Sequence, residues 1–112
     1  MQEACRSLAR FVAGKTFADY AADDLLRAAV ERKFEIVGEA LHGLLKRDPG
    51  LSSAITDSKK IIGFRNVLIH GYAIIKNDLV WETVQTKLPI LSAEVDRLLE
   101  NERQADDDPN GT

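Results

Sequence analysis

The feature that most constrains the fold is a stretch from Ala21 to Lys46 in which apolar residues recur every three or four positions without a proline. This spacing places the apolar side chains on one side of an α-helix. They form two adjacent stripes, Leu26, Val30, Phe34, Val37, Leu41 and Leu44 in the first and Leu25, Ala29, Ile36 and Ala40 in the second. So broad an apolar face predicts a helix of roughly 40 Å, at ~1.5 Å per residue, that packs against two or more neighbouring helices.

The N-terminal segment predicts a shorter helix that ends at Gly14, with Asp19 as a candidate N-cap of the long helix. Residues 13–16, AGKT, resemble the end of a phosphate-binding P-loop. That motif needs a glycine five positions before Gly14, where Ala9 stands, and a strand leading into it. We therefore interpret residues 13–16 as a turn. The apolar positions of the first helix are Ala4, Leu8, Phe11 and Val12.

A third helix is expected after the proline-glycine pair at residues 49–50, which ends the long helix. It begins near Ser53 or Asp57 and runs to about His70, because Gly71 is a natural helix terminator. Its inward positions are expected to be Ile61, Phe64, Val67 and Leu68.

The last helix is expected to start at Asn77 or Asp78. Pro89 predicts a kink, or a turn between a short helix and a longer one. The apolar positions are Val80, Val84, Leu88, Leu91, Val95 and Leu98. Because no segment alternates like a strand, we predict an all-α fold, an antiparallel four-helix bundle over residues 1–103. Residues 104–112 carry no large apolar side chain and are expected to form a disordered acidic tail.

Composition limits the class of protein. A chain of 112 residues is long enough for one domain with a single core. No apolar run approaches the ~20 residues of a membrane-spanning helix, and the N-terminus lacks the apolar centre of a signal peptide. We therefore expect a cytoplasmic protein with no membrane partner. Cys5 is the only cysteine, which excludes an internal disulfide and a cysteine-clustered zinc site.

Charge is distributed unevenly along the chain. The net charge of -3 arises from three aspartates at residues 106–108. Between residues 46 and 76, six basic residues stand against two acidic ones: Lys46, Arg47, Lys59, Lys60, Arg65 and Lys76 against Asp48 and Asp57. Such a patch can attract phosphate, although basic runs also occur on ordinary solvated surfaces.

Glu39 and His42 have the Glu-x-x-His spacing of di-iron helical bundles, with Glu35 one turn earlier. Such sites need a second Glu-x-x-His pair, and the only other histidine, His70, has Val67 at the corresponding position. We therefore expect no metal site, no cofactor and a partly exposed His42.

The segment RNVLIHGY, residues 65–72, places polar side chains around an apolar centre. On an ideal helix Arg65 and Tyr72 share one face, and Asn66 and His70 share an adjacent one. Histidine can transfer a proton near neutrality, arginine can bind phosphate, and asparagine and tyrosine can position an oxygen. A structural role is an equal alternative, in which Arg65 pairs with an acid across the bundle and His70 caps a helix end.

The pattern Arg-x4-His-x-Tyr, at Arg65, His70 and Tyr72, resembles the signature of the HepT-like proteins of the HEPN superfamily. Asn66 stands where an asparagine is common in that family. The segments FVAGKTFADY, AVERKFEIVGEAL and DLVWETVQTKLP also resemble its successive helices, so that the resemblance covers roughly residues 8–100. The family's first helix usually begins about a turn or more earlier than the first helix does here.

The resemblance implies a HEPN-like bundle that forms a symmetric homodimer through the motif-bearing helix. It implies a metal-independent endoribonuclease that cuts RNA, with Arg65 and His70 as catalytic residues and Asn66 and Tyr72 in supporting or RNA-positioning roles. It further implies a toxin whose partner, a minimal nucleotidyltransferase antitoxin, inactivates it by transferring AMP to Tyr72.

Two alternatives to an enzyme stay open. In one, the chain is a non-catalytic dimeric module that binds the nucleotidyltransferase and is modified by it. In the other, it is a purely structural bundle.

Overall fold

The structure, a computed structural model, describes residues 1–69 and 77–106. These residues form α-helices and one short 3-10 helix, without a strand, and so confirm the predicted all-α class. The elements are α1 (Gln2–Val12), α2 (Phe17–Ala22), α3 (Asp24–Arg47), η1 (Pro49–Ser53), α4 (Ser58–Ile69), α5 (Asn77–Thr86) and α6 (Leu88–Asp106).

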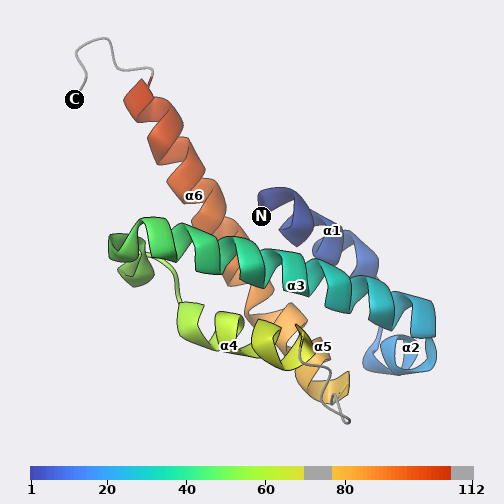
Figure 1. Ribbon diagram of the computed structural model, residues 1–112. Helices are drawn as coiled ribbons and strands as arrows, with labels where there is room; N and C mark the ends of the chain where they lie inside the picture. Colours follow the sequence, from blue (N-terminus) through green and yellow to red (C-terminus); the bar gives the residue numbers. More distant parts are fainter. Residues whose placement is uncertain (70–76, 107–112) are drawn as a thin grey trace.

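Helix α3 is the centre of the arrangement, and α1, α2, α4 and η1 all pack against it (Figure 1). Helix α6 packs against α1, while α5 contacts α2 and continues into α6. Figure 1 shows α1, α3 and α4 running alternately in opposite directions, with α5 and α6 together in the place of a fourth helix. The broad apolar face predicted for α3 therefore does meet several neighbours.

The core lies along α3. Its side chains Val30, Phe34, Val37 and Leu41 are fully buried, as the first predicted stripe requires. Leu25, which belongs to the second stripe and lies in the first turn of α3, is 81% exposed, whereas the adjacent Leu26 packs against the core. The other buried apolar residues are Ala4, Cys5, Leu8, Tyr20, Ile55, Ile61, Leu68, Val80, Val84, Leu88, Leu91 and Val95.

Two contacts between aromatic rings hold helices together, one between α3 and α4 and the other between α2 and α5. The rings of Phe34 and Phe64 meet edge to face, with centroids 4.9 Å apart, and this contact fixes α4 on α3. The rings of Tyr20 and Trp81 have centroids 5.4 Å apart and connect α2 with α5. Perpendicular and tilted ring pairs of this kind add stability beyond the burial of their area.

The long helix begins later than predicted. It was expected from Ala21, but α2 ends at Ala22 and α3 begins at Asp24. Asp23 separates the two helices because its side chain accepts a hydrogen bond of 3.1 Å from the backbone N–H of Leu26, as an N-cap does. The apolar stripes begin only at Leu25 and Leu26, so they do not locate the start of the helix.

The prediction of Asp19 as an N-cap is wrong. Thr16 is the N-cap of α2, and its hydroxyl accepts a hydrogen bond of 3.2 Å from the N–H of Asp19. The Asp19 carboxylate accepts one of 2.9 Å from the N–H of Thr16, which completes a capping box. An aspartate is favourable both at the cap and in the first turn, so residue type alone does not separate the two positions.

The other helix boundaries agree more closely with those predicted from the sequence. Helix α1 ends at Val12 and is followed by Gly14 with a φ of 71°. Helix α4 starts at Ser58, after Asp57 with a φ of 56°, and α5 starts at Asn77. The predicted break near Pro89 is a turn at residue 87 between α5 and α6.

Helix α6 continues to Asp106, and residues 107–112 lie outside the described part of the chain. The division into a domain at residues 1–103 and a tail at residues 104–112 stays a prediction. Within residues 1–69 and 77–106, none of the helices has the length and apolar character needed to cross a membrane.

Candidate functional site

Two of the four predicted site residues, Arg65 and Asn66, lie on α4, and His70 and Tyr72 lie outside the described residues. The structure brings the first two side chains together. Arg65 is half-buried, and its Nη1 donates a hydrogen bond of 2.8 Å to Oδ1 of the exposed Asn66. The amide of Asn66 therefore holds one edge of the guanidinium group at the surface of α4.

The rest of the Arg65 side chain is less well satisfied. Its aliphatic stem lies against Gly38 of α3, and its Nε is buried without a hydrogen-bond partner in residues 1–69 and 77–106. Among the described residues no carboxylate lies within ion-pair distance of Arg65, so the structural alternative of a salt bridge across the bundle finds no support there. The hydrogen bond to Asn66 lies exposed, so the outer N–H groups of the guanidinium are the ones that can donate to an anionic ligand.

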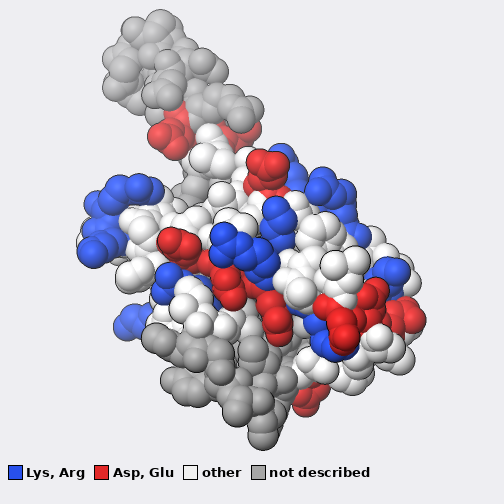
Figure 2. Space-filling view, turned by 45° about the vertical axis from the view of Figure 1, so that its right-hand side comes forward, with Lys and Arg blue, Asp and Glu red and all other residues white. Residues whose placement is uncertain are grey.

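The basic run around the motif is partly neutralised within the fold. Asp57 pairs with Lys87 at 3.0 Å and with Lys60 at 4.0 Å. The hydrogen bond and positive charge of Lys87, with a smaller effect of Lys60, lower the pKa of Asp57. Figure 2 shows acidic and basic side chains interspersed over the face in view. The basic excess seen in the sequence is therefore not one uniform positive surface.

The candidate metal ligands do not converge. Glu39 and His42 are both exposed on α3, as expected for His42. In the described part of the chain, no group of three or more histidine, cysteine, aspartate or glutamate side chains could hold a metal ion. Glu31 is half-buried, and burial, together with the negative charge of Glu35 one turn away, raises its pKa.

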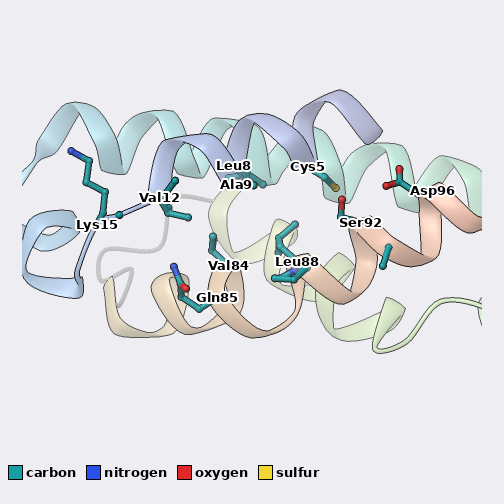
Figure 3. A pocket seen from close by; sticks show the side chains of 14 residues that line it. Cys5, Leu8, Ala9, Val12, Lys15, Val84, Gln85, Leu88, Ser92 and Asp96 are labelled. Atoms are coloured by element: carbon teal, nitrogen blue, oxygen red, sulfur yellow. The ribbon is translucent and has the colours of Figure 1, made fainter.

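A groove with a volume of about 560 Å³ lies between α1 and the junction of α5 with α6. Figure 3 shows Lys15 at one end of it and Asp96 at the other, with Leu8 and Val84 between them. Cys5 also lines the groove, but burial raises the pKa of its thiol to about 11, so the thiol is protonated at neutral pH and a poor nucleophile. Neither Arg65 nor Asn66 lines this groove.

Comparison with known proteins identifies the family of the chain. A family model described as ribonuclease HepT-like matches residues 1–98. A protein of Caldanaerobacter subterraneus subsp. tengcongensis, named as a candidate RNase, is 34% identical over 99 residues, which cover 88% of each chain. A second candidate RNase, from Methanocaldococcus jannaschii, is 29% identical over 94 residues, 84% of this chain and 85% of the relative. No solved structure matches the chain at a comparable level. Because the family model covers nearly the whole helical region, the chain belongs to the ribonuclease HepT-like family.

Proposed function

We propose that the protein is an endoribonuclease that cuts RNA with Arg65 and His70. The observation that carries the proposal is the state of Arg65, the arginine of the family motif. Its guanidinium is held by Asn66 and has no carboxylate partner among the described residues, so it can receive a phosphate. Membership of a ribonuclease HepT-like family, and two relatives named as candidate RNases, support the same activity.

The proposed reaction is an internal transfer within the RNA. His70, or a water that it activates, removes the proton from a ribose 2′-hydroxyl, and the 2′-oxygen bonds to the adjacent phosphorus as the bond from phosphorus to the 5′-oxygen breaks. Arg65 stabilises the negative charge that develops on the phosphoryl oxygens. The leaving 5′-oxygen takes a proton from a protonated histidine, and the products are a 2′,3′-cyclic phosphate and a 5′-hydroxyl.

A symmetric homodimer would supply both the base and the acid. The chain contains only two histidines, and His42 lies exposed on α3 rather than on the motif-bearing helix. Two copies related by a two-fold axis bring the same surface together from each subunit. His70 of one subunit can then act as the base while His70 of the partner subunit acts as the acid.

We further infer that the protein is a toxin controlled by a minimal nucleotidyltransferase antitoxin. The phenolic oxygen of Tyr72 would attack the α-phosphorus of ATP, lose its proton and release pyrophosphate, which leaves AMP on the tyrosine. A phosphate so close along the chain to Arg65 and His70 would compete with RNA for the same positive charge. The Arg-x4-His-x-Tyr motif and the family membership support this control.

Cleavage assays on alanine variants test the enzymatic proposal. We expect His70→Ala to lower the rate by about 10²–10⁴-fold and Arg65→Ala by about 10²–10³-fold. Arg47→Ala, which removes an arginine from the end of α3 outside the motif, serves as the matched control and should keep most of the activity. A non-catalytic binding module predicts no cleavage by the unmodified chain and only a modest loss of nucleotide binding in the motif variants.

Intact-mass measurement with and without the nucleotidyltransferase and ATP tests the control by adenylylation. The mass should rise in steps of one AMP in the wild type and not in Tyr72→Phe. Tyr20→Phe is the matched control, because Tyr20 is the other tyrosine of the chain, is fully buried and has a hydroxyl without a hydrogen-bond partner. AMP on Tyr72→Phe, or none on the wild type, contradicts this part of the proposal.

A further inference from the structure

Gly38 lies in the interior of α3, where it is buried against the base of the Arg65 side chain. A Cβ atom at position 38 would lie 2.4 Å from Cβ and 2.6 Å from Cγ of Arg65. Gly43, on the same helix, would meet no atom within 4 Å, and neither would Gly63 on α4. The contact with Arg65 therefore requires a residue without a side chain at position 38. Positions 43 and 63 have room for a methyl group.

The overlap at position 38 has no inexpensive relief. Cβ and Cγ of Arg65 are the first atoms of its side chain and cannot move far while the backbone of α4 stays in place. That backbone is fixed on α3 by the ring contact between Phe34 and Phe64 and by the burial of Ile61 and Leu68. A methyl group at position 38 would therefore push α4 away from α3, because no change of the Arg65 rotamer moves its Cβ atom.

The position of the Arg65 stem decides where its guanidinium points. With the stem against α3, Nε is buried without a partner and Nη1 reaches Oδ1 of Asn66. Glycine inside a helix is less favourable than alanine, so local helix stability does not explain its presence here. The close approach to Arg65 does explain it.

We propose that Gly38 is a positioning residue for Arg65, because its missing side chain lets α4 approach α3 closely enough to set the depth and direction of the guanidinium group. The expected effect on RNA cleavage rests on the proposed function. The contact itself does not, and the two are tested separately.

The first experiment compares three glycine-to-alanine variants in RNA cleavage and in urea unfolding. Gly43→Ala and Gly63→Ala are the matched controls, and both should keep kcat and raise the urea midpoint, since alanine favours a helix. Gly38→Ala should lower the midpoint and reduce kcat by about 100-fold, the loss expected when a catalytic group is misplaced by about 1 Å.

A second background separates positioning from general damage. Arg65→Gly removes both the guanidinium and the atoms that Gly38 touches. In this background Gly38→Ala should leave the residual cleavage unchanged and raise the urea midpoint, as the control substitutions do. General structural damage would instead lower cleavage by the same factor in both backgrounds.

The outcomes distinguish this inference from the proposed function. If the wild type cuts RNA and Gly38→Ala is equally active, the inference about Gly38 is overturned and the proposed ribonuclease function stands. If the wild type does not cut RNA, the proposed function fails. The inference is then decided by the urea midpoint: Gly38→Ala should lower it when Arg65 is present and raise it in the Arg65→Gly background. If Gly38→Ala does not fold, its rescue by Arg65→Gly supports the inference, and its failure in both backgrounds overturns it.

Discussion

A guanidinium group with a buried and unpaired Nε is an unfavourable arrangement in a folded chain. Arg65 has this arrangement, and its hydrogen bond to Asn66 satisfies only one other donor among the described residues. The planar fork of arginine suits a phosphate, which can accept from the outer guanidinium N–H groups and balance the charge, although it does not reach the buried Nε. A guanidinium group that is left without a full set of partners in the free protein is what a phosphate-binding role for Arg65 predicts.

Asp57 offers a test of local electrostatics by pH. Lys87 and Lys60 hold its pKa below the ordinary value of 3.8, so its ion pairs stabilise the folded chain above that pH. The contribution is lost as the pH falls through the lowered pKa of the folded state. Asp57→Asn, which tolerates the φ of 56° well, should lower the urea midpoint modestly at pH 7 and have little effect at pH 2.

Lys87→Gln is the companion to that variant, because it removes the main partner of Asp57. It should lower the midpoint at pH 7 by a similar amount, and the double variant should lose little more. An equal deficit at pH 2 and pH 7 in Asp57→Asn would show that the backbone at this turn, and not the ion pair, determines the effect.

The assignment of Arg65, His70, Asn66 and Tyr72 to the site stays a prediction, and the structure adds the support of Arg65, which the sequence did not reveal. Arg65 and Asn66 were expected to lie at one patch beside the inward face of α4, and the structure places their side chains in contact. Gly38 was not anticipated, because periodicity identifies the face of a helix and not the point at which another helix crosses it. A small residue in the middle of a broad apolar face was the available signal.

At the scale of the elements, caps determine where the helices begin and end. The capping box of Thr16 and Asp19 begins α2, and Asp23 begins α3 immediately after it. The apolar pattern predicted one uninterrupted helix here because it reports which side of a helix is buried and is insensitive to a break of one residue. The longer helices were therefore predictable, whereas the short helix α2 and the start of α3 were not.

The capping box predicts the effect of a threonine substitution. Thr16→Ala should destabilise the chain by about 1 kcal/mol, the usual loss for an N-cap hydroxyl, as measured by urea unfolding. Thr86→Ala is the matched control, since Thr86 is also exposed but its hydroxyl donates to the backbone oxygen of Glu82 within α5. Such a bond does not stabilise a helix, so the control should be near neutral, and equal losses in both variants would contradict the role of the cap.

At the scale of the whole molecule, α3 connects most of the other elements and presents α4 on one side. Ile69, the last residue of α4, is 44% exposed, which leaves an apolar side chain at the surface within the motif segment. An exposed apolar residue at this position is compatible with pairing of two copies through α4, as the proposed acid and base roles of His70 require.

Light scattering tests this pairing. The wild type should have twice the mass of one chain, and Ile69→Lys should shift the equilibrium towards the single chain. Leu25→Lys, at a more exposed leucine in the first turn of α3, should leave the mass unchanged. A wild type with the mass of one chain at the concentrations used for cleavage would contradict a dimeric active site.

The chemistry of the RNA ends tests the central claim most directly. Unmodified protein, purified without the nucleotidyltransferase, is incubated with a defined RNA, and the new ends are identified by mass spectrometry. The account predicts 2′,3′-cyclic phosphate and 5′-hydroxyl ends, formed by the wild type and lost in both His70→Ala and Arg65→Ala. Ends with a 3′-hydroxyl and a 5′-phosphate, or cleavage that persists in His70→Ala, would contradict it.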